Sequence, residues 1–124
     1  MDMISISDGE WKVMNLLWDK SPRSLTELAS ELKDETGWTK ATVNVMLNRL
    51  AAKNAVSIGM QGRAKLCSPI IRREDAVKQE AKSALSRIRP SGIGLLVSTM
   101  AEESRLSDEE IDELMNILKG AKGK

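Results

Sequence analysis

The sequence predicts a mostly α-helical protein that contains one short β-hairpin. Apolar residues recur at helical spacing in several segments along the chain, and they alternate with period two only around residues 56–68. Aromatic side chains are limited to three tryptophans, so the core must be built from Leu, Ile, Val, Ala and Met, a composition that favours helices. A length of 124 residues allows one globular unit or two small ones.

The first two helices are expected to begin at capping boxes. In each box a serine hydroxyl and a glutamate three residues later satisfy free backbone N–H groups, and the pairs are Ser7 with Glu10 and Ser24 with Glu27. Apolar residues follow at helical spacing in both segments: Trp11, Val13, Met14, Leu17 and Trp18, then Leu25, Leu28, Ala29 and Leu32. The stretch 21–23 ends the first helix, and the second ends near Gly37.

A third helix and a hairpin complete the first part of the chain. The helix is expected from about Thr39 to Lys53, with Val43, Met46, Leu47 and Leu50 on its apolar face. Alternation then marks two strands that turn at Gly62. Three short helices must pack on one another to bury their apolar faces. The order of elements predicts a winged helix-turn-helix domain over residues 1–72, made of three helices and a two-stranded β-wing.

Residues 73–124 are expected to form three further amphipathic helices, the last beginning at a Ser107–Glu110 capping box and ending at Gly120. This segment is too small for a good core of its own. Pairing with a second copy would bury its apolar faces, which predicts a helical dimerisation domain; folding back on the first domain is the alternative. The expected dimerisation residues are Val77, Ala81, Leu85, Ile93, Leu96, Val97, Met100, Ile111, Leu114 and Leu118.

The formal net charge of +1 hides a strong local asymmetry. Residues 39–73 contain no Asp or Glu, and their basic residues are Lys40, Arg49, Lys53, Arg63, Lys65, Arg72 and Arg73. A surface without carboxylates suits a polyanion, because an acidic group would repel phosphate. Chance clustering is the alternative interpretation.

The third helix is the candidate for insertion into the major groove of double-stranded DNA. The face opposite its apolar side carries the candidate DNA contacts Lys40, Ala41, Asn44, Val45 and Asn48. An asparagine can pair with adenine, and small apolar side chains suit a thymine methyl, although two asparagines on a solvated face would look the same. Thr39 and Thr42 stand at the helix start, where hydroxyls and free N–H groups can hold a phosphate.

Four other basic residues of this stretch are predicted to contact phosphates. They are Arg49, Lys53, Arg63 and Lys65, with Arg63 beside the hairpin turn at the tip of the wing. Arg49 has an equal alternative, a salt bridge with the acidic first segment. No aromatic residue lies in residues 39–73, which disfavours RNA and single-stranded DNA as partners.

Composition argues against an enzyme. The chain has no His, no Tyr and a single cysteine, Cys67, so most nucleophile–base pairs and zinc-ligand sets are missing, and no metal or cofactor is expected. No apolar run is long enough to span a membrane, the start of the chain lacks a signal pattern, and a lone cysteine fits a reducing compartment. A cytoplasmic location without membrane insertion is expected.

Two segments, 6–18 and 38–50, resemble the penicillinase repressor family, and the likeness extends to residues 106–114. The resemblance implies a homodimeric winged-helix repressor that binds dyad operators and controls genes of beta-lactam resistance or related stress responses. It also implies that a sensor-linked protease relieves repression by cutting the dimerisation domain. A winged-helix module that contacts proteins without specific operator recognition is the alternative.

Three departures from the family pattern bear on function. Ala41, Asn44 and Val45 occupy positions that often carry Lys, Arg and Thr in the family, whereas Thr42 and Arg49 match, so the operator sequence need not be the one familiar from the family. The position of the family's Asn-Phe cleavage bond corresponds to Thr99-Met100. Copper sensing through a C-terminal cysteine cluster, found in one branch of the family, is excluded because Cys67 stands alone.

Overall fold

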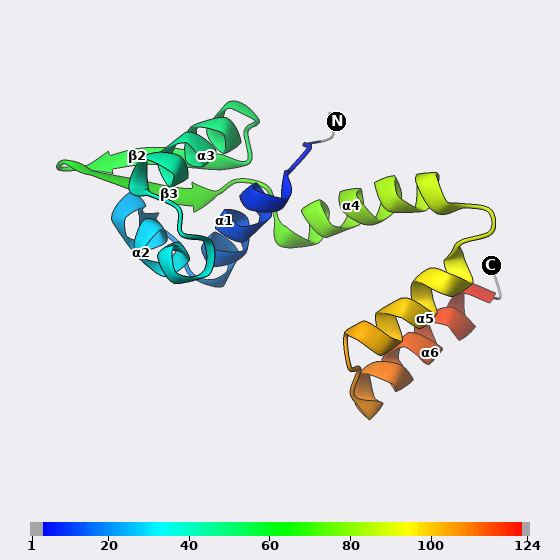
Figure 1. Cartoon of the computed structure of the whole chain (residues 1–124). Coiled ribbons are helices and arrows are strands. Elements are labelled where there is room, and N and C mark those ends of the chain that lie inside the picture. The colour runs from blue at the N-terminus through cyan, green and yellow to red at the C-terminus, as the bar shows by residue number, and fades with distance from the viewer. Residues whose placement is uncertain (1–3, 123–124) are drawn as a thin grey trace. The chain divides into compact units, whose positions relative to one another are not determined.

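A computed structural model describes residues 4–122, and the chain divides into two compact units, Met1–Lys82 and Ser83–Lys124. The first unit contains three helices followed by a hairpin, as predicted (Figure 1). Its elements before residue 73 are α1 (Asp8–Asp19), β1 (Arg23–Ser24), α2 (Leu25–Thr36), α3 (Lys40–Ala52), β2 (Val56–Gln61) and β3 (Ala64–Pro69). The fold is a winged helix-turn-helix.

The hairpin is confirmed, but the sheet has three strands rather than two. The strands are antiparallel in the order β1-β3-β2, and Arg23 of β1 pairs with Cys67 of β3. A two-residue strand is too short to show any periodicity in the sequence, which is why β1 was not predicted. Strands β2 and β3 extend together as the wing, and Gly62 takes a positive φ of 62° in the turn, a conformation that glycine adopts without strain.

The core of the first unit consists of the predicted apolar faces. Its buried residues are Val13, Met14 and Leu17 of α1, Leu28 and Leu32 of α2, Val43, Leu47 and Leu50 of α3, and Ala55, Val56 and Cys67 around the hairpin. Trp18 packs against this cluster and donates its indole N–H to the Ile71 carbonyl at 3.0 Å. Burial raises the pKa of the Cys67 thiol, so this cysteine acts as a small apolar core residue.

All three predicted capping boxes are present. Ser7 with Glu10 and Ser24 with Glu27 form reciprocal hydrogen bonds at the starts of α1 and α2. Ser107 and Glu110 do the same at the start of α6 (Asp108–Lys122), with both hydrogen bonds at 3.1 Å. Gly37 ends α2 with a left-handed φ of 70°. These local signals explain why the helix starts could be located from sequence.

The C-terminal part contains α4 (Arg73–Ile88), α5 (Ile93–Glu103) and α6. The boundary between the compact units falls inside α4, whereas the sequence placed a domain boundary before this helix. The start of α4 belongs to the first unit, where Ala76 is buried and Gln79 accepts a hydrogen bond from the Ile4 amide at 3.1 Å. The last helix continues to Lys122 rather than ending at Gly120, because glycine is tolerated inside an exposed helix.

Neither α5 nor α6 buries a single residue within the described chain. Their exposed apolar side chains include the predicted dimerisation residues Ile93, Val97, Met100, Ile111 and Leu118, and also Leu95, Met115 and Ile117. Between residues 4 and 122, no helix is long and apolar enough to cross a membrane.

An ion pair between a buried glutamate and a partly exposed lysine joins the start of α1 to the end of α3. Lys53 Nζ lies 2.6 Å from Glu10 Oε1 and 2.8 Å from the Ser5 carbonyl oxygen. Burial alone would raise the pKa of Glu10, but hydrogen bonds from Lys53 and Ser7, together with the lysine charge, hold the pKa below its ordinary value of 4.5. The second carboxylate oxygen of Glu10 has no partner within the described residues. Among the described residues, Lys53 is therefore the cation that compensates the buried charge of Glu10.

Replacing Lys53 by Met should lower the free energy of unfolding at neutral pH by about 2 kcal/mol, because the Glu10 carboxylate would stay buried without its cation. In the wild-type chain the depressed pKa makes this stabilisation complete above the ordinary value of 4.5, and it is lost as the pH falls through the lower folded value. The difference between the two proteins should therefore shrink in acid.

Urea unfolding from about pH 7 down to about pH 3 measures this difference. The control is Lys12→Met, which removes a lysine from an exposed pair with Glu35 and should change stability by less than about 1 kcal/mol. A Lys53→Met deficit that stayed constant with pH would show that the lost packing, not the lost charge, is responsible.

Candidate DNA-binding surface

Helix α3 separates its core residues from the predicted contact residues. Val43, Leu47 and Leu50 are fully buried, whereas Val45 is 47% exposed. Ala41, Asn48 and Lys40 are also exposed, and Asn44 is half-buried. Thr39 caps the helix by accepting a hydrogen bond from the Thr42 amide at 3.2 Å, and its hydroxyl lies 3.1 Å from that of Thr42. The helix therefore presents the predicted face away from the core.

An open hollow of about 510 Å³ lies between α3, the start of α2 and the wing. It brings together five predicted contact residues from two distant parts of the sequence: Lys40, Ala41, Asn44, Arg63 and Lys65. The rest of its lining consists of Ser24, Leu25, Thr26, Met60 and Ala64. The predicted Thr39, Thr42, Val45, Asn48 and Arg49 are not part of this lining.

The charged side chains that line the hollow are all basic. Lys40, Arg63 and Lys65 contribute cations, and none of the described residues that line the hollow carries a carboxylate. Arg49 is exposed on α3, and the ion pairs found within residues 4–122 do not include it, so the predicted alternative of a salt bridge is not realised there. Such a surface attracts an extended polyanion.

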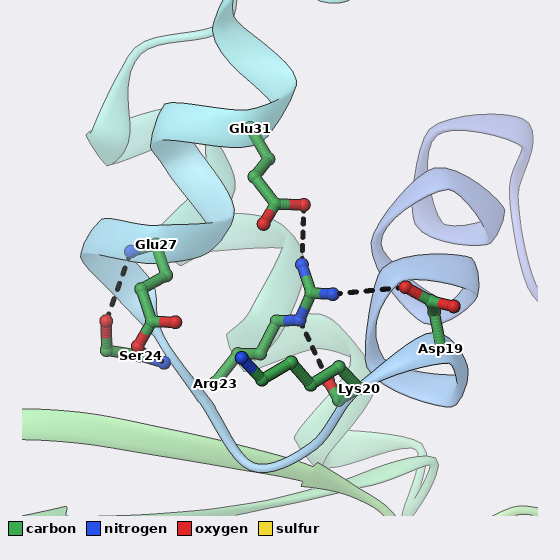
Figure 2. Close-up of polar contacts among 6 residues, drawn as sticks. All are labelled: Asp19, Lys20, Arg23, Ser24, Glu27 and Glu31. Carbon is green, nitrogen blue, oxygen red and sulfur yellow. Dashed lines mark hydrogen bonds and ion pairs between the residues drawn. The ribbon is translucent and has the colours of Figure 1, made fainter.

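A buried arginine holds the elements around the hollow in place. Arg23 is only 4% exposed, and its guanidinium bonds the Lys20 carbonyl at 2.9 Å, Asp19 at 3.3 Å and Glu31 (Figure 2). These groups come from the end of α1, the loop after it and the middle of α2. Because Arg23 also pairs through its backbone with β3, the same residue ties the helices to the wing. Sequence reasoning missed this role, since nothing local distinguishes a buried arginine.

Two predicted phosphate contacts have partners inside the protein. Lys53 pairs with Glu10, so in this structure its ammonium joins the end of α3 to the start of α1. Lys65, on the wing, donates from Nζ to Asn44 Oδ1 on α3 at 2.7 Å. These contacts join residues 43 and 21 positions apart in sequence, which local patterns cannot reveal.

The three-helix core, the wing and a basic surface along α3 define a winged-helix DNA-binding regulator. The model of the penicillinase repressor family matches residues 6–120, and the chain belongs to this family. It is a family of transcriptional repressors rather than enzymes.

Relatives match over nearly the whole chain. The penicillinase repressor of Bacillus licheniformis is 33% identical over 119 residues, covering 96% of this chain and 93% of the relative. The methicillin resistance regulatory protein MecI of Mammaliicoccus sciuri is 27% identical over 113 residues, covering 91% and 92%. The sequence-based resemblance is thereby confirmed.

Solved structures agree on the fold. The solution structure of the DNA-binding domain of the repressor BlaI covers 60% of this chain and 93% of its own, with 34% identity and a TM-score of 0.55. The Bacillus licheniformis BlaI monomer in complex with the blaP half-operator has the same coverage and identity, with a TM-score of 0.52.

Proposed function

We propose that this chain represses transcription by binding dyad operators in double-stranded DNA as a homodimer, with α3 in the major groove and the wing on the backbone. The observation that carries the proposal is the hollow between α3 and the wing, which has three cations and no carboxylate in its lining. The BlaI–half-operator complex supports it by family relationship. The regulated genes are proposed to be those of beta-lactam resistance or a related response, and the repressor acts in the cytoplasm.

The contact residues divide by chemistry. Ala41, Asn44, Val45 and Asn48 are proposed to meet base edges, because they occupy the exposed or half-exposed side of α3. Thr39, Lys40, Thr42 and Arg49 are proposed to hold the phosphates beside the helix. Arg63 lies in the turn between β2 and β3, where it reaches the DNA backbone or the adjacent minor groove.

The proposed phosphate contacts predict how operator binding depends on salt. If about six phosphates per dimer are neutralised, the logarithm of the operator binding constant should fall against the logarithm of the salt concentration with a slope near −5. Arg63→Ala removes two of these contacts per dimer, so it should flatten the slope by about 2 and weaken all DNA sequences alike. Fluorescence anisotropy in a salt series, with a duplex selected from a random pool, provides the measurement.

Lys12→Ala is the matched control, because Lys12 lies on α1 outside the hollow and should leave the slope unchanged. A loss of affinity confined to one DNA sequence would contradict the phosphate role of Arg63. Failure of the wild-type chain to select any sequence, with a shallow salt dependence, would instead support a protein-interaction module.

Homodimerisation is proposed from the uncovered apolar faces of residues 73–124. Val77, Ile93, Val97, Ile111 and Leu118 are each at least 38% exposed in the single chain. An isolated chain with this many exposed apolar side chains on three helices gains free energy by burying them against a second copy. A two-fold dimer also places two α3 helices on one face of the duplex, which requires a dyad operator.

Val97→Asp should convert the dimer into a folded monomer. Val97 is 39% exposed in the single chain, so aspartate is tolerated there when the face is free but is costly when a partner covers it. Sedimentation should show half the mass, with helical content unchanged by circular dichroism and operator affinity reduced. Ser98→Asp, on the next and also exposed residue, is the control. A Val97→Asp protein that stays dimeric would place the interface elsewhere.

Relief of repression by a sensor-linked protease is proposed to occur at Thr99-Met100. Both residues are exposed, and both lie inside α5. A protease must hold its substrate in extended form, so the helix has to open locally before cleavage. A cut here would separate α6 from the DNA-binding unit without removing any of the proposed DNA contacts.

Truncation after Thr99 reproduces the product of such a cut. We expect loss of dimerisation and a fall in operator affinity of about 10²- to 10⁴-fold, because two half-site contacts would no longer act at high effective concentration. Sedimentation and operator titration of the same sample measure both effects. A truncated protein that stays dimeric and binds as tightly as the full chain would reject cleavage as the means of induction.

A further inference from the structure

One hydrogen bond connects the helix that is proposed to enter the major groove to the wing. Lys65 Nζ of β3 lies 2.7 Å from Asn44 Oδ1 of α3, and both side chains line the hollow that faces the DNA in the proposed complex. Both residues are half-buried, so the contact is partly shielded from water. It joins two residues that would otherwise contact DNA independently.

The chemistry of this bond fixes the orientation of the Asn44 amide. A lysine ammonium can only donate hydrogen bonds, so the amide atom that faces it must be the oxygen. The amide nitrogen, with its two N–H donors, then points to the other side of the group. Within the described residues, neither this nitrogen nor the remaining N–H groups of Lys65 donate to a further protein acceptor.

This orientation changes which base the pair suits. A free asparagine offers one donor and one acceptor, which match the N6 and N7 edge of adenine. Lys65 occupies one lone pair of the Asn44 oxygen and turns this oxygen toward the wing. Asn44 then presents its two amide donors on the other side, and the neighbouring ammonium adds more donors and a positive charge. Guanine is the base whose major-groove edge carries two acceptors, O6 and N7.

We propose that Asn44 and Lys65 act as one donor pair that recognises guanine in the operator, with Lys65 as the residue that positions Asn44. This inference rests on the proposed function. It replaces two separate expectations, an adenine contact by Asn44 and a phosphate contact by Lys65. In this arrangement the wing contributes to base specificity through α3.

The test is selection of binding sites from a pool of random duplexes by the full chain and its variants, followed by titration of single-base operator variants. Lys65→Met keeps much of the side-chain stem and removes the charge, and Asn44→Ala removes the amide. Each should reduce the preference for guanine at the same base pair by about 5- to 150-fold. The double variant should be little worse than either single variant, because both remove one unit.

Two further variants separate positioning from general attraction. Lys65→Arg retains a donor that can reach Asn44, so it should restore most of the guanine preference. Lys40 also lines the hollow, but in the described structure it makes no hydrogen bond to Asn44. Lys40→Met should therefore weaken binding to all DNA sequences alike. Circular dichroism melting confirms that each variant is folded.

The inference is overturned if Lys65→Met weakens every sequence equally and its effect adds to that of Asn44→Ala, because Lys65 would then be a phosphate contact. It is also overturned if the wild-type chain selects adenine at the pair that Asn44→Ala affects. Failure of the wild-type chain to select any sequence is a different outcome, since it contradicts the proposed function itself.

Discussion

The arrangement of the first unit depends on the buried guanidinium of Arg23. A buried cation is unfavourable unless its hydrogen-bonding groups are satisfied, and here the acceptors come from the end of α1, from the following loop and from α2. The side chain can be satisfied only when these elements meet at one corner. The backbone of the same residue pairs with Cys67, so Arg23 also holds β3, one of the two strands of the wing, next to the helices. Together with the apolar core, this one residue holds α2 and the wing, which form two sides of the hollow.

The helices could be predicted from sequence because their signals are local. A serine and a glutamate three residues apart define each capping box, and the apolar spacing identifies the buried face. The hairpin could be predicted for the same reason, from alternation and a glycine at the turn. Strand β1 could not, because two residues carry no pattern and become a strand only when β3 lies beside them.

The candidate surface was partly predictable for a different reason. Absence of carboxylates is a compositional property, so residues 39–73 could be assigned to a polyanion without knowledge of their geometry. Composition cannot distinguish a lysine that faces DNA from one that neutralises a buried glutamate. Lys53 has the second role and Lys65 holds Asn44, and both assignments need the partner's position in space. Contacts between residues far apart in the sequence are therefore the part of this surface that could not be predicted from the sequence.

The two compact units differ in how they bury their apolar side chains. The first unit buries its apolar faces internally and keeps its cations on the surface, so its contact residues are held by its own core. Helices α5 and α6 bury no residue, so their apolar side chains stay exposed in the single chain. In the proposed repressor, DNA contacts and dimerisation are consequently encoded in separate parts of the chain. Operator affinity can then be changed by an event in α5 while α3 and the wing keep their geometry, because none of the residues that position them belongs to α5 or α6.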